Sequence, residues 1–267
     1  MVNLFTEDHA ALTGSRTVDV KSDLRPEKSY NLNLNFFKKQ YLSDGSLLQF
    51  DVTGFYTHFN NRIIGDFDTD PNRIIYDNLN GYAVSSGLSV NIDAILMNGL
   101  KITTGTTLLD VYTKNENAQK IIPVLTEKWT GTWGVSYKIK RLGLNLDYTG
   151  NIYGKMRLPV LGNNDPRSRF SPVWSVQNVQ LTFDKIRRVE IFGGVKNLLN
   201  FIPGRNDPFL IARSNDPFDK NVRYNSNGQV IADSGNPYGL TFDPNFIYAP
   251  NQGIRGFLGV RMKIDRF

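Results

Sequence analysis

Residues 29–36 read SYNLNLNF, with an apolar side chain at every even position and a serine or asparagine at every odd position. Successive side chains of a β-strand point to opposite faces, so this alternation predicts a strand with one apolar and one polar face. The same period of two is clear in five segments, residues 29–36, 48–57, 82–94, 129–139 and 142–149, and weaker in four, residues 100–111, 174–183, 189–198 and 254–264. The pattern therefore predicts nine strands, with a phase slip near Asn178 that indicates a bulge.

The composition sets the class of protein. With 267 residues, 40% apolar and 21% charged, the chain is neither disordered nor a helical membrane bundle, because no window holds the roughly 20 apolar residues of a spanning helix. It contains no cysteine, which excludes disulfides and thiolate sites. Residues 1–11 lack a basic segment followed by an apolar one, so we expect no signal peptide.

The connections alternate in length. Short turns at residues 43–45, 98–99, 140–141 and 185–188 alternate with long segments at residues 59–79, 113–125, 154–172 and 199–253. All short turns then lie at one rim and all long loops at the other, a pattern typical of an outer-membrane barrel with short periplasmic turns and long extracellular loops. A soluble sandwich shares the strand alternation but does not predict this asymmetry.

We therefore expect an all-β fold, an antiparallel transmembrane β-barrel portion that spans residues 1–267. The last strand ends at the short-turn rim, which places the C-terminus in the periplasm. In a chain of nine antiparallel strands the first and last run the same way, so they cannot close on each other antiparallel, and open strand edges are not tolerated in lipid. The sequence thus predicts one part of a larger barrel.

Three segments resemble a known family. Residues 195–200 read VKNLLN at the end of the penultimate strand and resemble the V-x-N-L-F-N motif of TonB-dependent outer-membrane receptors, with Leu199 at the usual Phe. Residues 242–264 resemble the closing loop and strand of such receptors in Bacteroidetes, and residues 23–29, DLRPEKS, resemble the L-x-P-E-x-S start of a mid-barrel strand. The likeness spans nearly the whole chain.

The resemblance implies the C-terminal part of the barrel of a TonB-dependent receptor. Family members have about 22 strands around a globular plug, and they import scarce nutrients with energy relayed by TonB. The plug and the upstream strands are absent from this chain. Expected partners are outer-membrane lipid, the upstream barrel and plug, TonB through the plug, and a surface lipoprotein.

One loop has spacing that suits a metal. Asp66, Asp68, Asp70 and Asn72 present oxygen atoms at every second residue, which is how loops wrap Ca²⁺. Pro71, however, occupies the place of the glycine that calcium loops need for their turn. A solvated acidic loop tip is the alternative, and we expect no other cofactor.

The longest loop carries the candidate ligand contacts. Arginines and aromatics mixed in it suit an anionic or flat chelate, and the candidates are Arg205, Arg213, Phe218, Arg223 and Tyr238. The alternative is a loop that only packs over the pore or against its neighbours.

No catalytic set emerges, so we expect no enzyme. The two histidines, His9 and His58, are far apart in sequence, and residues 150–155 lack the spacing of a phosphate-binding loop. The net charge of +6 suits an anionic partner, but the basic residues of turns 140–141 and 185–188 are split between separate turns, which disfavours nucleic acid. We interpret them as solvated turns.

The expected function is TonB-dependent uptake of a bulky nutrient, such as a siderophore, haem or cobalamin-like chelate. The alternatives are a glycan importer, a passive pore and a structural barrel fragment without transport.

Overall fold

The computed structural model describes residues 17–66, 73–117, 119–158, 168–203, 223–226, 230–234, 248–250 and 252–262. These residues form strands, turns and irregular segments. Among them there is no helix whose length and hydropathy would let it span a membrane.

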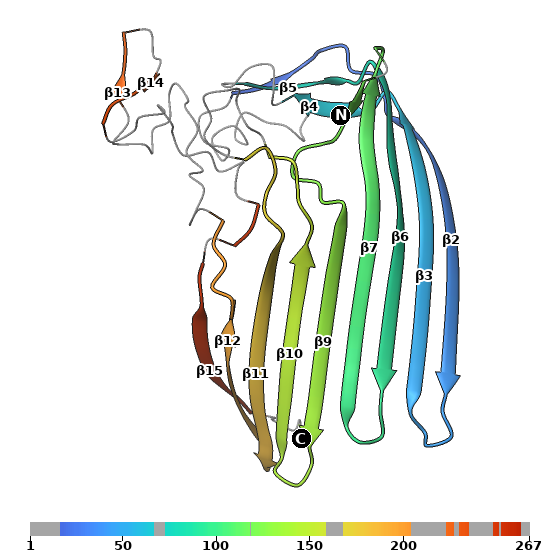
Figure 1. The fold of residues 1–267 in the computed structure, drawn as a ribbon, viewed down its shortest axis with the longest axis vertical. Coiled ribbons are helices and arrows are strands. Elements are labelled where there is room, and N and C mark those ends of the chain that lie inside the picture. The colour runs from blue at the N-terminus through green and yellow to red at the C-terminus, as the bar shows by residue number, and fades with distance from the viewer. Residues whose placement is uncertain are drawn as a thin grey trace, which may run out of the picture.

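Nine long strands form one antiparallel sheet in which the pairing order follows the chain (Figure 1). They are β2 (Lys28–Tyr41), β3 (Leu47–Asn60), β6 (Gly81–Ile95), β7 (Leu100–Asn115), β9 (Trp129–Ile139), β10 (Leu144–Tyr153), β11 (Trp174–Ile186), β12 (Val189–Lys196) and β15 (Arg255–Met262). The short strand β8 (Lys120–Ile121) adds to the end of β7. The nine strands predicted from the period of two are confirmed, with ends that differ by a few residues.

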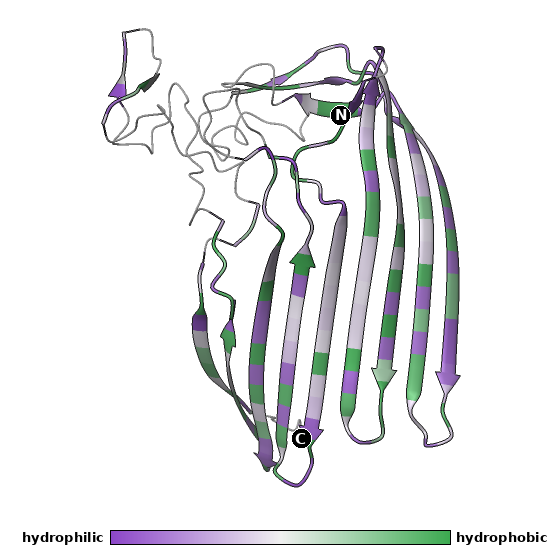
Figure 2. Ribbon diagram, in the orientation of Figure 1, coloured by the Kyte–Doolittle hydropathy of each residue, from purple (hydrophilic) through white to green (hydrophobic). Residues whose placement is uncertain are grey.

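The strand register keeps apolar side chains on one face. Leu34 pairs with Gly54, Gly54 with Leu88, Leu88 with Leu108, and Leu108 with Trp129, so one row crosses five strands. This face is open: the side chain of Leu34 is 77% exposed. Among the described residues no second sheet packs against it, and Figure 2 shows the alternation along each strand. A soluble sandwich would bury this face, so the single sheet with an apolar outer face supports the membrane interpretation.

The short turns lie together at one end of the sheet and the long connections at the other (Figure 1), as predicted. Gly45, Gly99 and Gly143 adopt φ angles of +84°, +92° and +65° in these turns, a region that glycine reaches without steric cost. The long connections contain β4 (Ile63–Asp66) and β5 (Arg73–Asn78), which form a small sheet with β1 (Thr17–Val20) of the segment before β2, and the pair β13 (Arg223–Tyr224) and β14 (Val230–Ile231).

Two short turns are joined through Ser46. Its backbone N–H and its hydroxyl both donate to the Asp44 carboxylate at 2.9 Å, and Ser46 Oγ accepts from the Met97 N–H at 3.2 Å. The Ser46 backbone N–H, followed by its hydroxyl, lowers the pKa of Asp44 below the ordinary value of 3.8. The β2–β3 and β6–β7 turns are thereby held side by side.

The bulge predicted near Asn178 is wrong in its position. β10 and β11 pair without interruption through Asn178, and the register shift lies between Phe183 and Ile186, where β11 pairs with β12. The apolar pattern changes phase near Asn178 for another reason. Trp174 and Val176 lie on the inner face, where they join one hydrophobic cluster.

The sheet is open at both sides. Within the described residues, β2 pairs only with β3 and β15 only with β12, and alternating directions along the nine strands make these two edges run the same way. As predicted, the nine strands do not close into a barrel by themselves.

The outer face gives a first prediction. Arginine at Leu34, Val90, Val135 or Leu146 should lower the free energy of unfolding of the membrane-inserted barrel by about 2–4 kcal/mol near the bilayer midplane, because a cation would then face hydrocarbon. Arginine at Asn33, on the inner face of the same strand as Leu34, is the matched control and should be tolerated. Denaturant titration in lipid vesicles measures the difference, and equal tolerance on both faces would contradict the assignment of the faces.

Candidate functional site

The inner face of the sheet carries a network of polar side chains. Asn35 Nδ2 donates to Asp51 Oδ1 at 2.8 Å, and Thr103 Oγ1 donates to Asp93 Oδ1 at 2.7 Å. Similar bonds link Ser89 with Thr107, Ser136 with Asn145, Gln180 with Thr182, and Arg261 with Glu190. Such a face suits an interior that holds water or polar groups.

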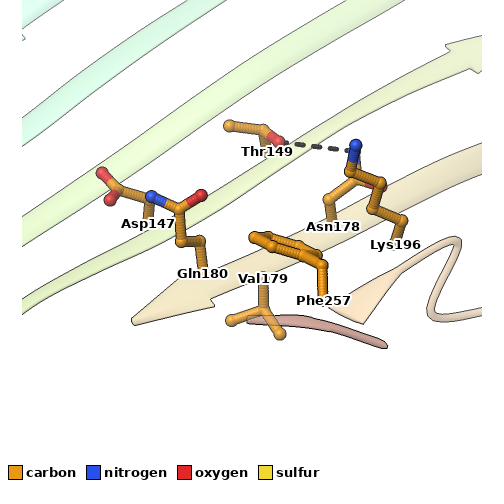
Figure 3. A pocket seen from close by; sticks show the side chains of 7 residues that line it. All are labelled: Asp147, Thr149, Asn178, Val179, Gln180, Lys196 and Phe257. Carbon is orange, nitrogen blue, oxygen red and sulfur yellow. Dashed lines mark hydrogen bonds between the residues drawn. The ribbon is translucent and has the colours of Figure 1, made fainter. Parts of the chain in front are cut away.

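A hollow of about 440 Å³ lies on this inner face (Figure 3). Its lining comes from four neighbouring strands and consists of Asp147, Thr149, Asn178, Val179, Gln180, Lys196 and Phe257. One cross-strand row supplies much of it, because Asp147 pairs with Gln180, Gln180 with Gly194, and Gly194 with Phe257.

Gly194 makes room for the aromatic part of the hollow. A Cβ atom added at Gly194 would lie 2.8 Å from Cζ of Phe257 and would collide with the Val179 carbonyl oxygen. The Phe257 ring therefore covers the strand where a side chain is missing. A similar pairing on the outer face places the Trp133 ring over Gly150.

The groups in the hollow suit binding rather than bond-making. Lys196 Nζ lies 5.4 Å from the centre of the Phe257 ring, and Asp147 accepts a hydrogen bond from Asn145 Nδ2 at 2.7 Å. The amides of Asn178 and Gln180 add neutral donors and acceptors. One cation, one carboxylate, two amides and an aromatic ring can hold a polar ligand or polypeptide segment.

An aromatic cluster lies on the inner face toward the long-loop end. Trp174 is 7% exposed and stacks between Tyr153, at 4.2 Å between ring centres, and Phe201, at 5.6 Å. Tyr248 approaches the same indole at 6.4 Å. Within the described part of the chain the Trp174 Nε1–H is buried without a hydrogen-bond partner. A buried unpaired donor costs about 1–3 kcal/mol, a cost that the packing of the aromatic rings in this cluster offsets.

The sequence pattern contained a signal for this cluster. Trp174 and Val176 are apolar at positions that the register assigns to the polar face, and we interpreted that mismatch as a bulge. Apolar side chains at polar-face positions near the loop end of a strand indicate a hydrophobic cluster on the inner face as well as they indicate a bulge.

The VKNLLN motif at residues 195–200 fastens the end of β12 to the start of β15. Asn197, at φ +53° and 4% exposed, donates through Nδ2 to the Phe201 carbonyl at 2.8 Å and the Gln252 carbonyl at 3.0 Å. Its Oδ1 accepts from the Phe201 N–H at 3.0 Å. Asn200 Oδ1 accepts from the Ile254 N–H at 2.9 Å. The two asparagines form what we term the asparagine clamp.

The DLRPEKS segment at residues 23–29 is fastened in a comparable way. Asn78 Oδ1 accepts from the Arg25 N–H at 2.6 Å, and its Nδ2 donates to the Arg25 carbonyl at 2.9 Å. Glu27 Oε1 accepts from the Ile63 N–H at 2.6 Å. The segment that leads into β2 is therefore tied to the β3–β6 connection.

Of the five candidate ligand residues, the described part of the structure contains Arg223 alone. Arg223 lies on β13 with an exposed side chain, and its Nε is 3.6 Å from Asp233 Oδ2. An exposed pair at this distance adds little stability. Arg205, Arg213, Phe218 and Tyr238 lie outside the described residues, so the ligand set stays a prediction.

The calcium site also stays a prediction. Asp66 ends β4, opposite Ile75, whereas Asp68, Asp70 and Asn72 lie outside the described residues. Within the described ranges, no group of three or more histidines and carboxylates lies close enough together to hold a metal ion.

If these side chains bind Ca²⁺, a calcium chelator should speed proteolysis in the loop at residues 59–79, because the ion would hold its acidic groups together. Limited proteolysis with and without chelator measures this, and D68N/D70N should show the fast rate in both conditions. Identical cleavage with and without chelator would show that these side chains do not bind Ca²⁺.

Comparison with known proteins gives one family. The family model described as TonB dependent receptor-like, beta-barrel matches residues 4–198. The comparison with curated proteins gave no match.

Three solved structures with a similar fold are receptors for import, for uptake or of the outer membrane. The ferric-catecholate import receptor Fiu from E. coli K12 has a TM-score of 0.56 at 14% identity, over 91% of this chain and 28% of that protein. The pyoverdine receptor FpvA from Pseudomonas aeruginosa PAO1 has a TM-score of 0.55 at 16% identity, over 90% and 30%. The ferric yersiniabactin uptake receptor FyuA from Yersinia pestis has 0.52 at 14%, over 88% and 30%. The chain thus spans under a third of the length of these receptors.

Proposed function

The chain belongs to the TonB-dependent receptor β-barrel family, and from this premise we propose that it forms part of the wall of an outer-membrane importer for a bulky ferric chelate. The family is located in the bacterial outer membrane and consists of transport receptors rather than enzymes. The activity of the whole protein belongs to this proposal, because the chain covers 28–30% of the receptors compared.

One observation carries the proposal. A single sheet has an apolar outer face, a polar inner face and all its long connections at one end (Figures 1 and 2). This arrangement suits a wall between lipid and an aqueous passage, with the long connections placed to meet cargo outside the cell. The short-turn end, and with it the C-terminus, then faces the periplasm.

The cargo class is supported by the names of the compared receptors and by the inner face. Fiu is a ferric-catecholate import receptor, FpvA a pyoverdine receptor and FyuA a ferric yersiniabactin uptake receptor. At the long-loop end, the partly buried rings of Tyr153, Phe201 and Tyr248 around Trp174 suit contact with a flat chelate. We extend the proposal to haem and cobalamin-like chelates of similar shape.

The partners in this proposal are an upstream barrel and plug, and TonB acting through the plug. A source among the Bacteroidetes, and with it a surface lipoprotein as a partner, rests on the resemblance of residues 242–264 to receptors of that group. The lipid that surrounds the barrel in this proposal is that of the outer membrane.

Uptake of radioactive iron tests the function. Cells that express the complete gene should accumulate ⁵⁵Fe from one of a panel of ferric siderophores, and deletion of tonB should abolish accumulation. Haem, cobalamin and oligosaccharides are supplied in parallel. Accumulation that persists without TonB would indicate a passive pore, uptake of oligosaccharide alone would indicate a glycan importer, and no uptake of any cargo would favour a structural barrel.

A further inference from the structure

Two basic turns that are far apart in sequence lie side by side at the short-turn end. The β9–β10 turn carries Lys140 and Arg141, and the β11–β12 turn carries Arg187 and Arg188, preceded by Lys185. Because β10 pairs with β11, the turns are neighbours (Figure 1).

The two turns are also in direct contact. Lys185 Nζ donates to the Arg141 carbonyl at 3.3 Å, and the Asp184 N–H donates to the Gly143 carbonyl at 2.9 Å. Gly143 permits this approach, because a Cβ atom there would lie 2.8 Å from Cβ of Lys185.

These turns concentrate positive charge on one half of the rim. All five basic side chains are exposed, and the nearby carboxylate of Asp184 already binds Lys138 at 2.6 Å. The other two short turns, residues 42–46 and 96–99, contain Asp44 and no basic residue, and the nearest lysines, Lys38, Lys39 and Lys101, lie within β2 and β7. Exposed cations on adjacent turns repel each other, and a bound anion relieves that repulsion.

Apolar side chains accompany the cations. Leu142 is 50% exposed in the first turn and Ile186 is 47% exposed at the end of β11. They continue the outer apolar face, where Leu144 pairs with Phe183 at the ends of β10 and β11. A surface with apolar side chains beside clustered lysine and arginine matches a molecule that has both acyl chains and a phosphate.

We propose that this basic rim, defined by Lys140, Arg141, Lys185, Arg187 and Arg188, binds the headgroup of an anionic phospholipid in the periplasmic leaflet. Guanidinium groups bind phosphate oxygens in a fork geometry, and lysine adds a point charge. The inference rests on the proposed function for its membrane orientation. It makes no use of the cargo or of TonB, so failure of the uptake test would leave it unaffected.

Spin-labelled lipids test the proposal on the barrel expressed from the complete gene and reconstituted in phosphatidylcholine. Labelled phosphatidylglycerol should associate at least about threefold more strongly than labelled phosphatidylcholine, given the attraction of about 1 kcal/mol per basic residue near a membrane surface. The preference should fall toward one in R141Q/K185Q/R187Q and, without any substitution, in 1 M salt. Soluble glycerol phosphate at millimolar concentration should not reduce it, which separates a lipid from a free phosphate.

The matched control is K38Q/K39Q/K101Q, which removes the same charge from β2 and β7 toward the short-turn end. It should keep the preference, and both variants should keep a heat-modifiable folded band. An unchanged preference in R141Q/K185Q/R187Q would overturn the proposal, and an acidic protein would then be the partner to consider for these cations. Equal losses in both triple variants would also overturn it, because the effect would then be one of net charge.

Discussion

Expressed alone, the 267-residue chain should aggregate or pair edge to edge with another copy instead of giving a folded monomer. β2 and β15 each have one pairing partner among the described strands, so each leaves a row of backbone groups unpaired. Such groups cost several kcal/mol each in lipid, and the two edges run the same way, so they cannot join antiparallel. Edge-to-edge pairing of two copies in the same membrane orientation would be parallel at both seams, so it should give oligomers or aggregates rather than a closed antiparallel barrel.

A second segment that contains an odd number of strands, which we term the complement, should pair with both open edges of the sheet and rescue folding. A strand antiparallel to β2 and a strand antiparallel to β15 both run toward the long-loop end, so a segment that joins them begins and ends in the same direction. Supplied in one chain or in trans, this segment should give a heat-modifiable, protease-resistant barrel in the outer membrane. A complement shortened by one strand is the control and should fail. A monodisperse folded monomer of the chain alone in detergent would contradict the prediction.

Substitution of Asn197 by alanine should strongly destabilise the closed barrel. The change removes two donors and one acceptor from a side chain that is 4% exposed, and it places alanine at φ +53°. Each unpaired buried group costs about 1–3 kcal/mol, so we expect a loss of about 3 kcal/mol or more. The temperature at which the folded band disappears on a gel, together with urea titration, measures it.

Two variants separate the contributions. Asn197→Asp keeps the acceptor for the Phe201 N–H, but it places a buried carboxylate oxygen against the Phe201 and Gln252 carbonyl oxygens, so it should destabilise the barrel at least as much as N197A. Leu199→Ala changes an exposed side chain in the same motif and should have little effect. N197A as stable as L199A would show that the asparagine clamp contributes nothing.

The strands and their connections could be predicted because their signals are local. A period of two and the spacing of turn residues are visible within ten residues of sequence, so residues 29–36 and their equivalents indicated nine strands and the two kinds of rim. The same local signal misled us at Trp174, where an apolar side chain on the inner face resembled a slip in phase.

The candidate sites depend on register between strands, which local patterns do not contain. The hollow needs Gly194 between Gln180 and Phe257, although Phe257 lies more than 60 residues further along the chain. The basic rim was interpreted as two solvated turns because Arg141 and Lys185 are distant in sequence, and only the pairing of β10 with β11 joins them.

The asparagine clamp also bears on how these receptors diversify. Asn197 reaches the Gln252 carbonyl and Asn200 reaches the Ile254 N–H, so both ends of the connection from β12 to β15 are fixed at one point of the rim. The segment between them can then be exchanged as a cassette, since its length and composition do not set the pairing of β12 with β15. Doubling the length of such a loop adds only about 0.6 kcal/mol of closure entropy. The proposed contacts with cargo can therefore change there while the wall is left intact.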